Sequence, residues 1–370
     1  MYCGADYMKF PEDQGSPTFQ TFHKFASVIL HSKGTAHQSS TLSNTQLFSA
    51  IMTQLTWLIT GCSSGFGEEL ILSVLARGDR AIATTRGSTD RIKHLKDAGA
   101  ATMSLDVTDS QAELDAKVQE ALKIYDGIDV LINNAGYIEA GLIEDITHER
   151  LVASCNTNLF GPVNLTRSIL PHFRQRKAGT IIFMGSVGGW QGEVGAGPYC
   201  VGKFGMEAVV ECLQKETSQF GIRTMILEPG YYRTKVYSEA NVKWEPLSIP
   251  EYEPIQTALK DMLKVVDGNQ PGDPKKAAER IVDIVRREGL AAGKETPPRL
   301  PLGPDGLQQL KNKCMSTLKI LEDWEELITS TNLDAWCKDD CAYFVEISIE
   351  PCAESFLFKS IQFYDIGETS

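Results

Sequence analysis

The sequence predicts an α/β fold, a doubly wound parallel sheet of about seven strands with helices on both faces, in a single domain. From Leu55 onward, apolar runs of strand length alternate with longer segments of helical periodicity. These runs are apolar almost throughout, as expected for strands that helices cover on both faces. A glycine-rich turn also lies between the first run and the first helical segment. Together these observations are typical of consecutive βαβ units.

The elements follow in order along the chain. The strands are expected at Trp57–Thr60, Ala81–Thr85, Thr102–Leu105, Val130–Asn133, Thr180–Met184, Arg223–Leu227 and, most weakly, Arg299–Leu302. Helices are expected between the first six strands at Phe66–Ala76, Ser110–Tyr125, Thr147–Gln175 (in one or two pieces) and Pro198–Phe220. Asp273-Pro274 begins a further helix, with Asp as the N-cap and Pro as the first residue. A last helix, Pro304–Ser330, follows the seventh strand.

The ends of the chain differ from its middle. Residues 1–53 are polar, rich in Ser, Thr, Gln and His, and without periodicity, so we expect a disordered extension. Residues 54–335 are expected to form the catalytic domain, and residues 336–370 an appended tail. Met52 stands directly before the first strand, so residues 1–51 are expected to be dispensable for folding, and a misplaced start in the gene model would explain them.

Composition excludes several classes of function. The formal net charge of −12 argues against a protein that wraps nucleic acid or lies on anionic lipid. No run approaches the roughly 18–20 apolar residues of a membrane helix, and the first arginine is Arg77, so we read no targeting signal. The nine cysteines form no C-x-x-C pair and have no zinc-site spacing. We expect reduced thiols, a cytoplasmic location and no metal.

The glycine-rich turn is the first candidate site. The strand Trp57–Thr60 runs directly into Gly61-Cys62-Ser63-Ser64-Gly65-Phe66-Gly67 and then into a helix. Glycines allow backbone amides to approach a pyrophosphate, and the helix N-terminus behind them offers free N–H groups to the phosphates. An ordinary strand–helix turn is the alternative. The βαβ context favours a dinucleotide site of the Rossmann type.

The end of the second strand indicates which dinucleotide binds. An acidic residue there would hold the ribose hydroxyls of NAD, whereas an arginine suits the 2′-phosphate of NADP. The sequence has Arg86 at this place and no acidic residue before Asp90. NADP(H) is therefore the expected cofactor, and a solvated loop arginine is the alternative for Arg86.

Three residues form a candidate catalytic set. Tyr199 and Lys203 are four residues apart in a helical segment, so they share one face. A nearby ammonium stabilises a phenolate, and lowering its pKa by two to three units needs roughly 3–4 kcal/mol. Ser186 follows the strand Thr180–Met184, where its hydroxyl could bind a substrate carbonyl oxygen. Each feature alone is common. Their order along the chain, each on its expected element after the glycine-rich turn, makes coincidence unlikely.

The chain resembles the short-chain dehydrogenase/reductase family, in its compact NADP-preferring type, over about residues 55–305. Six ordered motifs carry the resemblance: Thr60-Gly61-Cys62-Ser63-Ser64-Gly65-Phe66-Gly67, Asp106-Val107, Asn133-Asn134-Ala135-Gly136, Asn158-Leu159-Phe160-Gly161, Ser186 with Tyr199 and Lys203, and Pro229-Gly230 with Thr234. The chain departs from the family pattern at Tyr231-Tyr232, where a small or β-branched second residue is usual.

The resemblance implies a reaction and a set of roles. NADPH would deliver hydride to a substrate carbonyl while Tyr199 donates the proton and Ser186 holds the oxygen. Lys203 would bind the nicotinamide ribose and lower the pKa of Tyr199, and Asn158 would link the lysine to solvent through a water. The implied cofactor contacts are Thr60, Gly61, Ser63, Ser64, Gly65, Phe66, Gly67, Arg86, Asp106, Val107, Asn134, Ala135, Gly136, Tyr199, Lys203, Pro229, Gly230, Tyr232 and Thr234.

The substrate loop is expected at residues 231–271, because a connection of that length is usually functional. The loop contains six aromatic and aliphatic residues: Tyr231, Tyr232, Tyr237, Trp244, Leu247 and Ile249. These side chains suit a fairly apolar ketone or alcohol, such as a steroid-like, retinoid-like or polyketide compound. The alternative is that they simply pack the loop on the sheet. A preference for NADP favours reduction in the cell, although the same site runs in both directions. The resemblance also implies a homodimer or homotetramer, formed through the helices that contain Asn158 and Tyr199.

Two other functions remain open. One is a non-catalytic NADP-binding sensor or scaffold on the same fold, since fold alone does not prove function. The other is a dehydratase or epimerase, although those relatives usually carry a longer C-terminal substrate domain.

Overall fold

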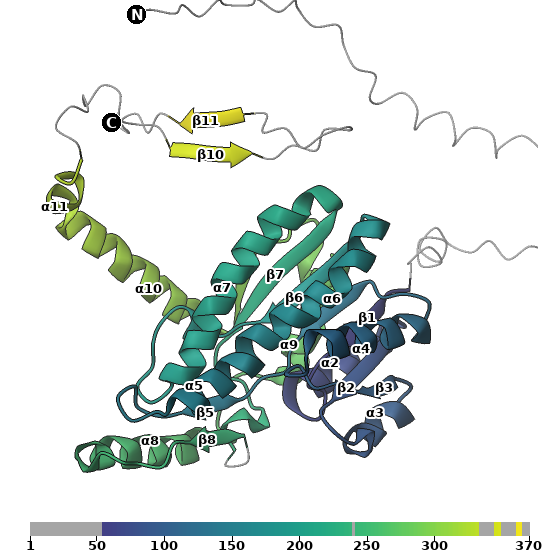
Figure 1. The fold of residues 1–370 in the computed structure, drawn as a ribbon, viewed down its shortest axis with the longest axis horizontal. Helices are drawn as coiled ribbons and strands as arrows, with labels where there is room; N and C mark the ends of the chain where they lie inside the picture. The colour runs from purple at the N-terminus through teal and green to yellow at the C-terminus, as the bar shows by residue number, and fades with distance from the viewer. Residues whose placement is uncertain (1–53, 239–240, 333–343, 349–359, 365–370) are drawn as a thin grey trace, which may run out of the picture. The chain divides into compact units, whose positions relative to one another are not determined.

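A computed structural model describes residues 54–238, 241–332, 344–348 and 360–364. Its centre is a seven-stranded sheet in the order β3-β2-β1-β4-β6-β7-β9, and all neighbouring strands are parallel (Figure 1). The strands are β1 (Thr56–Ile59), β2 (Arg80–Thr85), β3 (Ala101–Ser104), β4 (Val130–Asn133), β6 (Gly179–Met184), β7 (Ile222–Pro229) and β9 (Arg299–Leu302). The predicted single-domain α/β fold is therefore confirmed, including the weak seventh strand.

The helices confirm most of the predicted pattern. They are α2 (Gly65–Ala76), α3 (Lys93–Asp97), α4 (Gln111–Ile124), α5 (His148–Cys155), α6 (Gly161–Arg176), α7 (Gly197–Thr217), α8 (Glu253–Val266), α9 (Pro274–Arg286), α10 (Pro304–Asp323) and α11 (Glu325–Thr329). The segment predicted at 147–175 is two helices joined by a π-helical turn, η2 (Asn156–Phe160). Asp273 caps α9 as expected, since its carboxylate accepts from the amides of Lys275 and Lys276.

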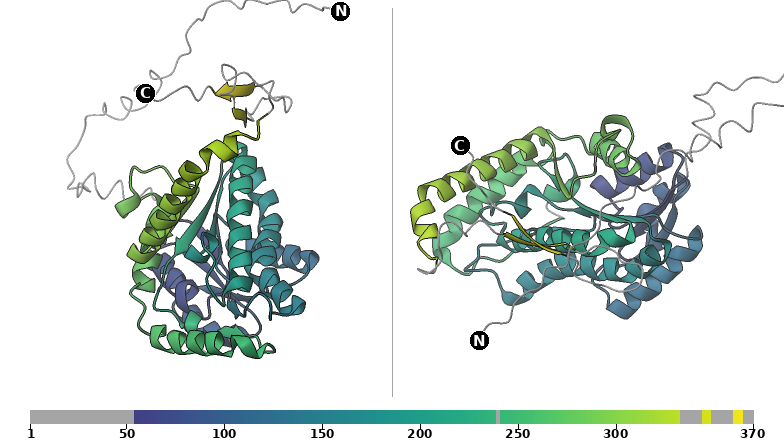
Figure 2. Two further views of the ribbon diagram at one scale, coloured as in Figure 1. Left: turned by 90° about the vertical axis from the view of Figure 1, so that its left-hand side faces the viewer. Right: turned by 90° about the horizontal axis from the view of Figure 1, so that it is seen from above.

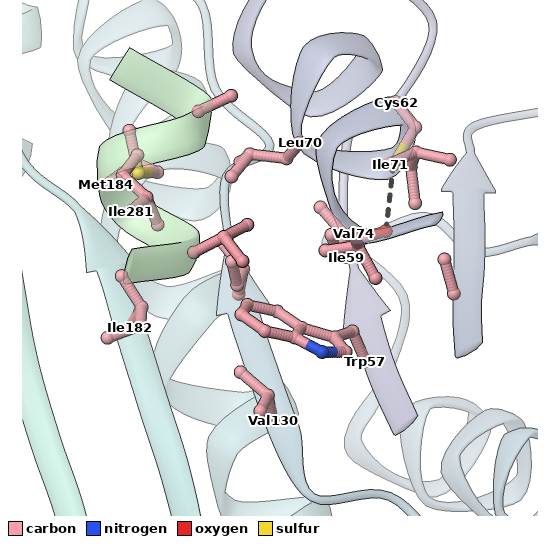
Figure 3. Close-up of a cluster of buried hydrophobic side chains, with 14 of the residues drawn as sticks. Trp57, Ile59, Cys62, Leu70, Ile71, Val74, Val130, Ile182, Met184 and Ile281 are labelled. Carbon is pink, nitrogen blue, oxygen red and sulfur yellow. Dashed lines mark hydrogen bonds between the residues drawn. The ribbon is translucent and has the colours of Figure 1, made fainter. Parts of the chain in front are cut away.

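Two hydrophobic cores lie on opposite faces of the sheet, because successive side chains of a strand alternate. On β1, Trp57 and Ile59 belong to the core beneath α2 and α9, whereas Leu58 belongs to the core beneath α4, α6 and α7. Figure 3 shows Trp57 and Ile59 among side chains of the first core, and Figure 2 shows the sheet and its helices from two further sides. This double coverage explains why the strands read as continuous apolar runs.

The segment predicted as a substrate loop carries its own secondary structure. Within 231–271, the short strand β8 (Val242–Trp244) pairs in parallel with β5 (Ile138–Ala140), and α8 follows. In the C-terminal tail, β10 (Phe344–Ser348) pairs antiparallel with β11 (Ser360–Tyr364). The predicted disorder of residues 1–53 lies outside the described residues. Among the helices that are described, none has the length and apolarity to cross a membrane.

Candidate active site

A cavity of about 340 Å³ lies along the carboxyl ends of the sheet strands. This is the edge at which open α/β sheets bind their ligands. The structure brings most of the predicted site residues together in its lining: Gly61, Ser63, Ser64, Gly65, Phe66, Arg86, Asp106, Val107, Asn134, Ala135, Gly136, Ser186, Tyr199, Lys203, Pro229, Gly230, Tyr232 and Thr234. Thr60, Gly67 and Asn158, which were also predicted, are not part of this lining.

Thr60 supports the glycine-rich turn from behind. Its hydroxyl accepts hydrogen bonds from the amides of Asn134 (2.9 Å) and Ala135 (3.0 Å). The Asn134 side-chain amide donates in return to the carbonyls of Thr60 (2.8 Å) and Gly61 (3.1 Å). These bonds tie the turn to the end of β4, so Thr60 acts on the cavity through the backbone it holds.

Two residues of the turn have a positive backbone angle φ, which favours glycine. Gly61 has φ +70° and Gly65 has φ +62°, values that other residues adopt only with strain. A Cβ at Gly61 would also lie 2.8 Å from the Cα of Ala135. Ser64, the N-cap of α2, makes no side-chain capping bond. The first amides of α2 therefore keep their capacity to bind an anion at the cavity.

Two guanidinium groups lie at the end of β2. Arg86 is exposed and lies 3.9 Å from the carboxylate of Asp106. Arg91 also lines the cavity and donates a 3.4 Å hydrogen bond to the carbonyl of Arg86. The sequence analysis missed Arg91, because nothing in the local pattern indicates that the turn after β2 returns it to the cavity. It also missed Lys235 and Lys243, which line the same cavity.

Ser186 and Tyr199 meet at the end of β6. The Ser186 hydroxyl caps the 3₁₀ turn η3 (Val187–Gly189) by accepting a 3.0 Å hydrogen bond from the amide of Gly188. Burial raises the pKa of Tyr199 to about 12, and a hydrogen bond with Ser186 opposes that rise. Tyr199 is therefore protonated at neutral pH in this geometry.

Lys203 lies on the same face of α7 as Tyr199, as their spacing predicts. Its Nζ donates a 2.6 Å hydrogen bond to the carbonyl of Met184 and lies 5.5 Å from the centre of the Tyr199 ring. Burial lowers the pKa of Lys203 to about 8, because it disfavours the ammonium. Burial therefore raises the pKa of Tyr199, whereas the sequence predicts that Lys203 lowers it. That lowering by Lys203 stays a prediction.

Asn158 is fully buried in the π-helical turn η2. Its Oδ1 accepts from the amide of Tyr137 (3.2 Å), and its Nδ2 donates to the carbonyl of Tyr137 (3.1 Å) and the hydroxyl of Ser154 (3.3 Å). The side chain thus fixes Tyr137, which lines the cavity. Its predicted part in a proton relay stays a prediction.

The loop residues divide into two groups. Tyr232 and Tyr237 line the cavity, and Tyr232 packs on Phe66 with ring centres 5.0 Å apart. Tyr231 stacks behind Tyr237 at 5.8 Å and 21°. Outside the lining are the remaining candidates, Trp244, Leu247 and Ile249. The wall nearest Tyr199 is therefore aromatic, and much of the predicted apolar loop packs elsewhere.

In the described part of the chain, no three His, Cys, Asp or Glu side chains cluster in a way that could hold a metal ion.

Comparison with known proteins gives consistent results. The model of the short chain dehydrogenase family matches residues 56–244. Oxidoreductase BOA17 of Botryotinia fuckeliana is 32% identical over 73% of this chain and 97% of its own. A short-chain dehydrogenase structure from Streptomyces avermitilis superposes with a TM-score of 0.68 at 33% identity, covering 76% of this chain and 99% of that one. An actinorhodin polyketide ketoreductase solved with NADPH has a TM-score of 0.54 at 27% identity, covering 67% and 95%.

Proposed function

The chain belongs to the short-chain dehydrogenase family and is an oxidoreductase, and from this premise we propose that it reduces a carbonyl group of a fairly apolar small molecule with NADPH. The observation that carries the proposal is one cavity in which the glycine-rich turn and the set Ser186, Tyr199 and Lys203 lie together. The same site would oxidise a secondary alcohol in the reverse direction.

The residues present fit a nicotinamide dinucleotide. The turn from Gly61 to Gly67 brings backbone within reach of a pyrophosphate, and the uncapped amides of α2 face the same place. Lys203 would bind the nicotinamide ribose, and Pro229-Gly230 with Thr234 would bind the nicotinamide end. Bound NADPH supplies the hydride at the substrate carbon.

Tyr199 is the proposed acid. Its raised pKa keeps the phenol protonated at neutral pH, which is the form that a reduction requires at the carbonyl oxygen. Ser186 would hold that oxygen by a hydrogen bond and stabilise the charge that develops on it. We propose that Lys203 then stabilises the phenolate that remains after proton transfer.

NADP rather than NAD is the proposed cofactor because of the charge at the end of β2. Arg86 and Arg91 both line the cavity there, and two guanidinium groups suit a phosphate. The similar ketoreductase was solved with NADPH. Asp106 lies 3.9 Å from Arg86, whose side chain stays exposed, so its guanidinium can still reach a phosphate.

The aromatic wall formed by Tyr199 and Tyr237 supports a fairly apolar, ring-containing substrate. Val236 and Ile138 extend this wall along the cavity. A polyketide is one candidate class, since the ketoreductase of similar fold acts in that chemistry by name. Steroid-like and retinoid-like ketones present the same kind of surface.

We also propose a homodimer or homotetramer and a cytoplasmic location. Exposed apolar side chains gather on α5, η2 and α7, the helices that the resemblance places at a subunit interface: Val152, Phe160, Val201 and Phe204. The cysteines at 62, 155, 200, 212 and 314 are all free, as in a reducing compartment. Sedimentation of the purified chain tests the oligomeric state.

The decisive experiment is a screen of the purified chain with NADPH against cyclic ketones, open-chain ketones and aldehydes of graded polarity. We expect NADPH oxidation with apolar cyclic ketones and recovery of the matching alcohol. NADPH binding without turnover of any carbonyl would favour the sensor or scaffold function. A product changed elsewhere than at the carbonyl would favour a dehydratase or epimerase.

A further inference from the structure

Two buried carboxyl groups lie on elements that also carry candidate site residues. Glu207 lies on α7, one helical turn after Lys203, and Glu228 is the residue of β7 directly before Pro229. Glu207 is 7% exposed and Glu228 is 0% exposed. Carboxylates are almost never buried unless they are paired, so their environment needs an explanation.

Trp190 and Arg299 link them into one cluster. Arg299 lies 3.6 Å from Glu207, and its guanidinium carbon lies 4.9 Å from the centre of the Trp190 ring. The indole Nε1 of Trp190 donates a 2.8 Å hydrogen bond to Oε1 of Glu228. Within the described chain, no further donor reaches the other Glu228 oxygen or either oxygen of Glu207. Three buried carboxyl oxygens of the two groups therefore lack a donor, and a proton on one of the groups would supply one.

The charges around the pair do not neutralise both groups. Arg299 of β9 lies 3.6 Å from Glu207, and it also pairs with Glu211 on the outer part of α7. The Lys203 ammonium donates to the carbonyl of Met184 instead of to Glu207. One guanidinium shared among three carboxyl groups leaves an excess of negative charge, which a proton can remove.

The direction of the pKa shifts agrees with this geometry. Burial raises the pKa of Glu207 to about 8, and repulsion from Glu228 adds to the rise. Burial also raises the pKa of Glu228, but the hydrogen bond from Trp190 opposes it. Because Trp190 donates to Glu228 and stabilises its carboxylate, we take Glu207 as the proton donor of the pair and Glu228 as the acceptor.

We propose that Glu207 and Glu228 share one proton and act as a positioning pair for the active site. The pair joins three elements that carry site residues: α7 with Lys203, β7 with Pro229-Gly230, and, through Trp190, the turn that follows Ser186. The inference rests on the proposed function, which gives those residues their roles.

Packing at this junction leaves little room for the pair to separate. A Cβ at Gly189 of η3 would lie 3.0 Å from Oε1 of Glu207 and 3.1 Å from the carbonyl oxygen of Lys203. When Glu207 loses its proton to water, two buried anions remain in contact. Their repulsion acts on α7 and β7, and so on Lys203 and the segment after Glu228.

The sign of the effect on stability follows from linkage. Because the pKa of Glu207 is raised in the folded state from its ordinary 4.5 to about 8, the folded protein holds this proton more tightly than the unfolded chain. The stabilisation is complete below about pH 4.5 and is lost progressively as the pH rises to about 8. Replacing Glu207 by Gln removes this pH dependence, because an amide donates a hydrogen bond at every pH.

The test compares the full chain with E207Q and with the control E211Q. Glu211 is an exposed carboxylate on the same helix and pairs with the same arginine, Arg299. Infrared difference spectra between pH 6 and pH 9 should show loss of a protonated-carboxyl band in the wild type and in E211Q, but not in E207Q. Above pH 8, NADPH affinity should fall more steeply in the wild type than in E207Q. E207Q should keep only the part of the fall that comes from Lys203, whose pKa is about 8 in the wild type.

The melting temperature gives a measurement that needs no cofactor or substrate. The advantage of E207Q over the wild type should grow between pH 5 and pH 8. Absence of the infrared band, or equal pH profiles for NADPH binding in the wild type and E207Q, would overturn the proposal. If the band and the binding profile behave as expected but no carbonyl is reduced, the positioning pair stands and the proposed reduction fails.

Discussion

A Cβ on Gly67 would lie 2.4 Å from the carbonyl oxygen of Gly61, so the start of α2 packs directly against the turn that leads into it. The Asn134 side-chain amide, which holds the same turn, would lie 2.7 Å from that Cβ. Gly67 therefore supports the cavity wall without lining it.

Gly67→Ala should weaken NADPH binding by about 5–150-fold, because the added methyl group must displace the turn or the Asn134 bond, each of which costs about 1–3 kcal/mol. Fluorescence titration with NADPH measures the effect. Gly192→Ala is the matched control, since a Cβ there meets nothing within 4 Å. Equal affinity in both variants would contradict the proposed role of the turn.

Tyr199→Phe should lower kcat by about 10²–10⁴-fold, the usual contribution of a positioned acid, and leave NADPH binding nearly unchanged. Steady-state reduction of the best ketone from the screen, together with NADPH titration, checks both parts. Tyr252→Phe removes the hydroxyl of a partly exposed tyrosine that binds Glu144, and it should be fully active. Turnover retained in Tyr199→Phe would refute the assignment of the acid.

Arg86→Asp should shift the cofactor preference toward NADH. Removing one charged contact to a phosphate costs about 1.5–3 kcal/mol, so the ratio of kcat/KM for NADPH over NADH should fall roughly 10–100-fold. Lys93→Asp makes the same charge change on exposed α3 and should leave the ratio unchanged. An unaltered ratio in Arg86→Asp would remove this arginine from the cofactor site and leave Arg91 as the candidate.

A shortened chain of residues 52–335 should fold and bind NADPH as the full chain does. The seven strands and both hydrophobic cores lie within these residues. Circular dichroism and NADPH titration of the two chains test this proposal of a single catalytic domain. Failure of the shortened chain to fold would assign a structural role to the terminal segments.

The sequence by itself determined the fold and the order of the candidate site residues. Strand runs such as Val130–Asn133 and the turn after Thr60 are local features, because apolar periodicity and glycine backbone freedom act over a few residues. The spacing of Tyr199 and Lys203 also fixes their common face through helix geometry alone. Ser186 lines the same cavity as Tyr199 and Lys203.

Only the tertiary structure decided which groups from distant segments meet. Arg91 reaches the cavity through the path of the turn after β2, and β8 pairs with β5 about a hundred residues earlier in the chain. The Asn158 side chain binds Tyr137, which the sequence analysis did not foresee. Glu207 and Glu228 each look like an ordinary charged residue in their own element. Their shared proton arises because packing of α7 on β7 removes both from water and places them in contact, an effect that no local pattern encodes.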